Sequence, residues 1–281
     1  MLPSFEQLIL DLTPRYGPGE ARSIARIVFE DVFGTRKPAQ KILDAVEQET
    51  YGNIRQRLMC GEPVQYVLGQ ADFFGLKFDV TPDVLIPRQE TEELVAWVLD
   101  WLKSRNLQTP AVLDIGLGSG CIAVALKARR RDIQLFGLEK SPHALAVAAR
   151  NAGRILGTGN WVFEVGDILE ESSWSGFPML DVIVSNPPYI PRQEQHLMPE
   201  HVVAFEPAMA LFVDDADPLL FYQRIAVFAQ HKLKPGGALF FECNEFNAST
   251  VAQRLLALGF PNVELRKDLS GKDRMLLAIN P

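Results

Sequence analysis

The sequence predicts an α/β fold in which a mainly parallel β-sheet is covered by helices on both faces. From about residue 90, apolar runs of strand length alternate with helical patterns such as 94–102 and 144–151, as in parallel strands joined by crossover helices. The last two strand candidates are linked by residues 268–273, which are too few for a helix and therefore predict an antiparallel hairpin. The strand candidates are residues 111–115, 133–138, 161–165, 180–185, 238–242, 262–265 and 274–279.

The region before residue 72 predicts a small helical bundle. Apolar residues recur there at helical spacing, first around Ile24 and Val28 and again in the stretch 39–49. Glycine and proline residues punctuate these helical stretches, which indicates short helices joined by turns. The apolar residues of the two patterns are Ile24, Ile27, Val28, Val32, Ile42, Leu43 and Val46.

A third pattern lies between the helical region and the α/β region. Apolar residues alternate from Phe73 to Val80, which favours a β-hairpin, and we expect its turn at Pro82-Asp83. The predicted organisation is a helical domain over residues 1–71, a β-hairpin linker over 72–88 and an α/β domain over 89–281.

Composition and charge narrow the class of protein. The chain of 281 residues has an ordinary hydrophobic fraction of 47% and no apolar run near the roughly 18 residues that span a bilayer. Its net charge is −7, whereas a stand-alone duplex-binding protein usually carries a basic face. The cysteines, Cys60, Cys121 and Cys243, are far apart, which favours a reducing compartment over a disulfide framework. We therefore expect a cytoplasmic protein without a signal peptide, a membrane partner or direct nucleic-acid binding.

A glycine-rich turn, Gly116-Leu117-Gly118-Ser119-Gly120, follows the first strand candidate of the α/β region. Glycines let a backbone approach a ligand closely, and the helix that begins near Cys121 offers free N–H groups. Many nucleotide-binding folds share such a turn, but the dinucleotide fingerprint G-x-G-x-x-G would need glycine where Cys121 stands. G-x-G-x-G after an acidic residue, here Asp114, is instead the pattern of class I methyltransferases, which use S-adenosylmethionine.

Acidic residues follow the next two strand candidates. Glu139 stands about 20 residues beyond the glycines, where a carboxylate can accept hydrogen bonds from both hydroxyls of a ribose. After the third strand, Asp167 can accept from an adenine amine, and Ile168 can pack against the ring. Because parallel strands of an α/β sheet bind ligands at their carboxyl ends, these residues predict one cofactor site together with the glycine turn.

The most specific motif is Asn186-Pro187-Pro188-Tyr189, directly after the fourth strand candidate. The nitrogen of an amide or of a nucleobase amine is a poor nucleophile, and its N–H groups become better donors as it attacks a methyl group. The Asn186 side-chain oxygen and the Pro187 carbonyl can accept from these groups, the prolines hold the loop rigid, and Tyr189 can stack on a planar target. The sulfonium is already an activated leaving group, so we expect no metal and no general base. The histidines, which show no ligand spacing, are His143, His196, His201 and His231.

With these motifs the sequence resembles the peptide-chain release factor glutamine methyltransferases, the PrmC/HemK family. The Asn186–Tyr189 loop matches the family's NPPY motif, and the resemblance extends over nearly the whole chain. Segments outside the loop separate this family from other NPPY enzymes. They are residues 63–69, 74–76, 84–92, 205–207, 233–237 and 268–274.

The resemblance implies a helical domain that engages a release factor and a Rossmann-like, seven-stranded class I methyltransferase domain with an antiparallel last strand. It implies methyl transfer from S-adenosylmethionine to the glutamine amide nitrogen of the factor's Gly-Gly-Gln motif. It places Arg88 and the NPPY loop on the substrate side, and the glycine turn, Glu139 and Asn186 on the cofactor side. Four departures from the family pattern, which change the surroundings of the cofactor but remove no reacting group, are Gln89, Glu139, Ile168 and Cys243-Asn244.

Two other functions remain compatible with parts of the sequence. A DNA adenine-N6 or cytosine-N4 methyltransferase shares the asparagine–proline loop, but it needs a basic surface or a target-recognition domain to reach a base. A non-catalytic protein could keep the fold as a binding platform, but such a relic is expected to lose the glycines or Asn186, and both are present.

Overall fold

The structure is a computed structural model that describes residues 4–281, and it divides into two compact units. The first unit consists of Met1–Gln70 with Pro199–Phe205, and the second of Ala71–Met198 with Glu206–Pro281. The segment Pro199–Phe205, which follows the NPPY loop in the chain, therefore belongs to the helical unit and not to the α/β unit.

The first unit is built from helices. Its longest helix, α1, is kinked at Gly17, where φ is 74°, a value that favours glycine. Phe29 of α1 packs edge-on against Phe5 and Phe33, and Leu58 of α2 is fully buried in the same apolar cluster. The helices of this unit are α1 (Ser4–Asp31), η1 (Pro38–Gln40), α2 (Ala45–Met59), α3 (Val64–Leu68) and α7 (Glu200–Phe205).

The predicted helical stretch 39–49 is wrong in its first half. Helix α2 begins only at Ala45, because a capping box fixes its start. The Asp44 carboxylate accepts from the Glu47 backbone N–H, and the Glu47 carboxylate accepts from the Asp44 backbone N–H. Ile42, which belongs to the apolar pattern that predicted the helix, is 89% exposed. The local capping box fixes the start of the helix and overrides the apolar spacing.

A hairpin lies in this region, but the predicted pairing across Pro82-Asp83 is wrong, because residues 84–86 form no strand. Strands β1 (Gln70–Phe73) and β2 (Leu76–Asp79) are joined at Phe74-Gly75, where φ is 51° and 72°. Two successive positive φ values match the twist of two-residue hairpins. Pro82-Asp83 forms a separate turn, closed by the Val84 N–H on the Thr81 carbonyl, that leads the chain toward α4.

The second unit contains a seven-stranded sheet in the order β10-β11-β9-β6-β3-β4-β5. Strands β9, β6, β3, β4 and β5 are parallel, and β11 is antiparallel to both β9 and β10. The antiparallel hairpin predicted from the short link is therefore confirmed. The strands are β3 (Ala111–Ile115), β4 (Gln134–Glu139), β5 (Trp161–Val165), β6 (Leu180–Ser185), β9 (Leu233–Glu242), β10 (Asn262–Lys267) and β11 (Asp273–Ile279).

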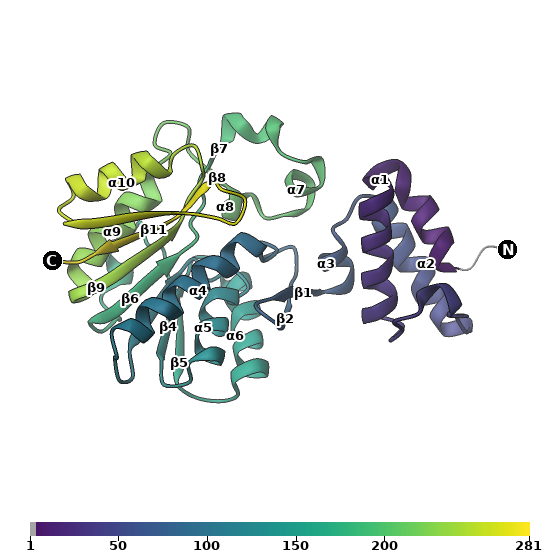
Figure 1. Cartoon of the computed structure of the whole chain (residues 1–281), viewed down its shortest axis with the longest axis horizontal. Coiled ribbons are helices and arrows are strands. Elements are labelled where there is room, and N and C mark those ends of the chain that lie inside the picture. Colours follow the sequence, from purple (N-terminus) through teal and green to yellow (C-terminus); the bar gives the residue numbers. More distant parts are fainter. Residues whose placement is uncertain (1–3) are drawn as a thin grey trace. The chain divides into compact units, whose positions relative to one another are not determined.

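Helices cover both faces of this sheet, as Figure 1 shows. In β9, Ala238 and Phe240 pack with α4, α5 and α6, whereas Leu239 and Phe241 pack with α9 and α10. Both faces are apolar, so the strand reads as a continuous apolar run without alternation. The remaining elements of this unit are α4 (Gln89–Ser104), α5 (Cys121–Arg129), α6 (Pro142–Leu156), η2 (Glu171–Trp174), β7 (Ile190–Pro191), η3 (Arg192–Leu197), α8 (Ala208–Leu211), β8 (Phe212–Val213), α9 (Leu220–Lys232) and α10 (Ala248–Ala257).

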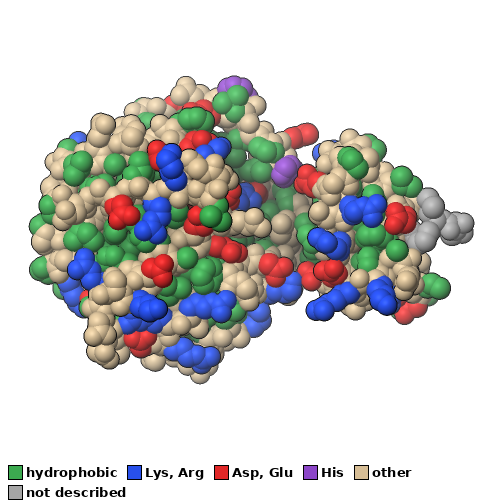
Figure 2. Space-filling view, viewed as in Figure 1, with side chains coloured by type: hydrophobic (Ala, Val, Ile, Leu, Met, Phe, Trp, Pro, Cys, Tyr) green, Lys and Arg blue, Asp and Glu red, His purple; other side chains and the backbone are tan. Residues whose placement is uncertain are grey.

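Charged side chains of both signs are mixed on the surface. On the face shown in Figure 2, Lys and Arg side chains lie among Asp and Glu side chains, so the net charge of −7 is not gathered in one acidic patch there. Within residues 4–281, every helix is too short or too polar to cross a bilayer.

One buried side chain joins the hairpin to the glycine turn. Asn151 of α6 is fully buried, and its Nδ2 donates to the carbonyls of Asp79 and Ser119, both at 2.9 Å. Its Oδ1 accepts from the Asp79 backbone N–H at 2.8 Å. A single amide therefore satisfies backbone groups of two loops that are far apart in the sequence.

Replacing Asn151 by Ala should lower the free energy of unfolding by about 2–4 kcal/mol, because three backbone groups lose their buried partner. Chemical denaturation measures this change. The exposed Asn262→Ala variant at the start of β10 is the control and should change stability by less than about 0.5 kcal/mol. Equal stability of the two variants would contradict the role of Asn151.

Candidate active site

The carboxyl ends of the parallel strands meet at one edge of the sheet. Ile115 of β3 is level with Leu138 of β4 and with Ser185 of β6, and Ser185 is level with Phe241 of β9. The loops that follow these strands are therefore neighbours. They carry the glycine turn, Glu139, the NPPY motif and Glu242.

A cleft opens at this edge, with about 1140 Å³ of empty space when the part open to solvent is included. The structure brings most of the predicted site residues into its wall, whereas Gly120 and Tyr189 lie outside the lining. The predicted residues in the wall are Arg88, Gly116, Leu117, Gly118, Ser119, Glu139, Asp167, Ile168, Asn186, Pro187 and Pro188.

All three glycines of the turn have positive φ, which is 77° at Gly120, but their surroundings differ. Gly116 and Gly118 have positive φ (79° and 52°), and a Cβ added to either would meet no protein atom within 4 Å. Gly120 is the N-cap of α5, and its Cβ would lie 3.2 Å from Ala148 of α6. The first two therefore leave open space in the cleft, and the third lets two helices approach each other.

Asp114 lies beneath the turn and caps α5. Its Oδ2 accepts from the Ala123 backbone N–H at 3.1 Å, and its Oδ1 has no hydrogen-bond partner. Asp114 is 1% exposed, and this burial, with a smaller contribution from the charge of Glu139, raises the pKa of its carboxyl to about 8. The acidic residue before the turn is thus a structural part of the loop.

Glu139 holds the loops on both sides of it. Its Oε2 accepts from the Gly118 N–H at 2.9 Å and its Oε1 from the Ser141 N–H at 2.8 Å. A carboxylate offers about four acceptor positions, so each oxygen retains one for a ligand. The side chain is fixed in place before any ligand arrives.

Asp167 is also held before binding. Its Oδ1 accepts from the Leu169 N–H at 2.9 Å, and its Oδ2 forms an ion pair of 2.8 Å with Lys140. Ile168 is buried in the apolar cluster beneath it. Lys140 was not predicted as part of the wall of the cleft, although it directly follows Glu139 in the sequence.

The side chain of Asn186 belongs to a chain of hydrogen bonds that begins at the wall of the cleft. Its Nδ2 donates to Thr91 Oγ1 over 3.4 Å, and the Thr91 hydroxyl donates to Glu242 Oε2 at 2.6 Å. Neither Thr91 nor Glu242 was predicted as a site residue. The position of Glu242 at the end of a parallel strand was a usable signal, but nothing in the sequence links Thr91, in the first turn of α4, to Asn186.

The other two predicted substrate residues have protein partners. The Arg88 guanidinium pairs with Glu206 Oε1 at 2.6 Å, and Glu206 also accepts from the Ile86 N–H. Tyr189 packs against the apolar cluster that contains Tyr222, and burial raises the pKa of its phenol. The stacking of Tyr189 on a target group stays a prediction.

The fold is that of the class I S-adenosylmethionine-dependent methyltransferases. The family model of the methyltransferase small domain matches residues 95–206. The catalytic domain of hMettl16, solved in complex with MAT2A 3′UTR hairpin 1, has a similar fold with a TM-score of 0.59 at 16% identity. The match covers 83% of this chain and 80% of that one.

Sequence relatives identify the family. The release factor glutamine methyltransferase of Bacteroides thetaiotaomicron is 37% identical over 268 residues, which is 94% of each chain. The release factor glutamine methyltransferase of Burkholderia pseudomallei is 42% identical over 263 residues, 89% of each chain. The chain belongs to the release factor glutamine methyltransferase family, and the resemblance seen in its motifs is confirmed.

The raised pKa of Asp114 predicts a pH dependence of stability. Between its ordinary value of 3.8 and about 8, the unfolded chain releases this proton while the folded chain retains it, so this group lowers stability as pH rises. An asparagine at this position cannot ionise, so Asp114→Asn removes this contribution to the pH dependence of the unfolding free energy. Unfolding free energies at pH 5 to 8 should therefore fall less steeply for Asp114→Asn than for the wild type.

The exposed Asp100→Asn variant of α4 controls for the loss of one carboxylate. Parallel curves for Asp114→Asn and the wild type would show that Asp114 is ionised in the folded protein.

Proposed function

We propose that this chain transfers a methyl group from S-adenosylmethionine to the side-chain amide nitrogen of the glutamine in the Gly-Gly-Gln motif of peptide-chain release factors. The observation that carries the proposal is that the NPPY loop and the glycine turn line one cleft, in a chain that belongs to the release factor glutamine methyltransferase family. The product is N(5)-methylglutamine.

The wall of the cleft fits the cofactor. Gly116 and Gly118 leave open space where a side chain would stand, and Glu139 retains acceptor positions for the two ribose hydroxyls. Asp167 and Ile168 line the same cleft, and we assign Asp167 to the adenine amine and Ile168 to one face of the ring. When bound, S-adenosylmethionine supplies an activated methyl group with a good leaving group.

The NPPY loop supplies the acceptors for the amide. As the glutamine nitrogen attacks, its N–H groups gain positive charge, and hydrogen bonds to them strengthen in the transition state. The Asn186 Oδ1 and the Pro187 carbonyl take these bonds. Pro187 and Pro188 fix φ and add no backbone donor, so the carbonyl groups need little reorganisation during the reaction.

In this reaction the helical domain, the linker and two side chains near the cleft take part in binding the release factor. The helical domain of residues 1–71 engages the body of the release factor, residues 72–88 link it to the catalytic domain of residues 89–281, and Arg88 and Tyr189 border the path of the target glutamine. Because release factors act in translation, the reaction takes place in the cytoplasm.

Mass spectrometry of a release factor incubated with this protein and S-adenosylmethionine tests the proposal. One added methyl group is expected on the loop glutamine. Asn186→Ala should lower kcat by about 10²–10³, by analogy with the loss of one preorganised transition-state hydrogen bond. Cofactor affinity should fall less.

The Asn262→Ala variant is the matched control and should retain wild-type turnover. Methyl transfer to DNA without transfer to the release factor would favour the nucleic-acid alternative. Near-normal turnover of Asn186→Ala would remove Asn186 from the mechanism.

The cofactor site gives a second test. In Glu139→Gln the side-chain NH₂ replaces one acceptor, so the N–H of Gly118 or Ser141 faces another donor. The affinity for S-adenosylmethionine, measured by calorimetry, should fall about 10- to 100-fold, since charge-assisted hydrogen bonds contribute about 1.5–3 kcal/mol each. Glu264→Gln on the exposed face of β10 is the control, and equal affinity of both variants would argue against the assigned site.

A further inference from the structure

The polar chain behind Asn186 is buried and connects three elements. Thr91 of α4 is 3% exposed, and Glu242 at the end of β9 is 2% exposed. Thr91 Oγ1 lies 3.4 Å from Asn186 Nδ2 and 2.6 Å from Glu242 Oε2. The nearby Asn186 amide also favours the charged form of the Glu242 carboxyl and lowers its pKa. Asn186 of the NPPY loop is therefore held by two side chains, those of Thr91 and Glu242, which have no role in the methyl transfer described above.

The hydrogens that Thr91 and Glu242 can donate decide how the side-chain amide of Asn186 is oriented. A threonine hydroxyl has one hydrogen, and Thr91 gives it to Glu242. An ionised carboxylate has none to give. Both groups can therefore only accept from Asn186, and the opposite orientation of the amide would place its oxygen against two acceptors. This arrangement turns Nδ2 toward the protein and leaves Oδ1 for the cleft.

The charge of Glu242 is controlled by its surroundings. Burial raises the pKa of this carboxyl to about 7, while the hydrogen bond from Thr91 and the positive charge of Arg274 on β11 oppose that rise. Glu90 on α4 adds to the rise. The other titratable groups that interact with Glu242 are Cys121 of α5, Tyr189 of the NPPY loop, Tyr222 of α9 and Cys243.

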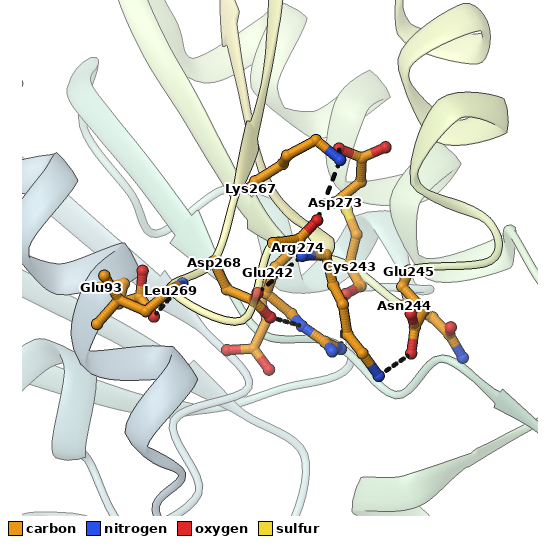
Figure 3. A network of polar contacts seen from close by, with 12 residues as sticks. Glu93, Glu242, Cys243, Asn244, Glu245, Lys267, Asp268, Leu269, Asp273 and Arg274 are labelled. Atoms are coloured by element: carbon orange, nitrogen blue, oxygen red, sulfur yellow. Dashed lines mark hydrogen bonds and ion pairs between the residues drawn. The ribbon is translucent and has the colours of Figure 1, made fainter.

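The loop between β10 and β11 holds Arg274 in place, as Figure 3 shows. Asp268 Oδ2 accepts from Arg274 Nε at 3.2 Å, and Asp268 Oδ1 accepts from the Lys272 backbone N–H at 2.9 Å. Arg274 also donates to the Cys243 carbonyl at 3.4 Å, directly after Glu242 in the chain. The segment 268–274, which is one of the segments that resemble the family, therefore fixes a positive charge beside Glu242.

We propose that Thr91 and Glu242 are positioning residues that hold the Asn186 side chain with its oxygen turned toward the cleft, where it accepts from the target amide. The inference rests on the proposed role of Asn186 in amide methylation. Thr91, which lines the cleft, and Glu242, which lies behind it, act through the side chain of Asn186. Their loss affects the methyl-transfer step more than the binding of either partner.

Thr91→Val keeps the shape of the side chain and removes its hydroxyl, and Thr91→Ser keeps the hydroxyl. In single-turnover methylation of a release factor, Thr91→Val should be slower by about 10- to 100-fold, with KM for the factor nearly unchanged, because the acceptor is present but no longer held. Thr91→Ser should recover to within about threefold of the wild type. The exposed Thr250→Val variant of α10 is the matched control.

The pH profile separates this role from a structural one. The ionised Glu242 carboxylate is needed to hold the Asn186 side chain in this orientation. Turnover should therefore rise with pH through the pKa of Glu242. The Thr91 hydrogen bond lowers that pKa, so Thr91→Val should move the acidic limb to higher pH, whereas Thr91→Ser should not. If Thr91 only stabilised the fold, Thr91→Val would change the melting temperature of the protein and leave the acidic limb of the pH profile in place.

An NMR measurement keeps the test independent of the substrate. The Asn186 NH₂ signal, assigned by its loss in Asn186→Ala, should exchange slowly with water in the wild type and in Thr91→Ser, and faster in Thr91→Val. Unchanged exchange in Thr91→Val, or equal losses of rate in the valine and serine variants, would overturn the inference. A wild-type protein that fails to methylate the release factor while showing the exchange pattern would overturn the proposed function and leave the orientation of Asn186 established.

Discussion

The parallel register of the central strands is the constraint on which the rest of the molecule depends. Ile115, Leu138, Ser185 and Phe241 are level with one another, so four loops that are far apart in the sequence begin at the same edge of the sheet. Parallel strands require crossover helices, and the helices on both faces keep the strands apolar and buried. The side chains that follow the strands are the first polar groups at this edge, and they form the wall of the cleft.

Several polar side chains at this edge accept from or donate to backbone groups, and these hydrogen bonds organise the loops. Asp114 caps α5 under the glycine turn, and Glu139 joins that turn to the start of α6. Asn151 ties the hairpin to the same turn. A fully connected polar group specifies one arrangement of the backbone, because any other arrangement leaves it unpaired in a low dielectric. These hydrogen bonds therefore fix the positions of the loops that form the wall of the cleft.

The antiparallel hairpin of β10 and β11 also supplies residues to this edge of the sheet, at the amino end of β11. Because β11 runs against β9, its first residues lie beside the last residues of β9, and Met275 is level with Glu242. This reversal brings Arg274 and the loop that holds it next to a carboxylate behind the NPPY motif. An all-parallel sheet would place the amino end of the strand at the opposite edge, and the charge of Glu242 would have no such support.

The sequence by itself determined the strands of the sheet, the antiparallel hairpin, the glycine turn and the NPPY loop, because apolar runs, short links and proline or glycine restrictions act locally. It misplaced the start of α2 and the turn of the β1–β2 hairpin, where a capping box and two positive φ values decided the outcome. Only the tertiary structure brought Thr91 and Glu242 to Asn186. The three residues come from elements distant in the chain, and their contact follows from sheet register and helix packing, which no local pattern encodes.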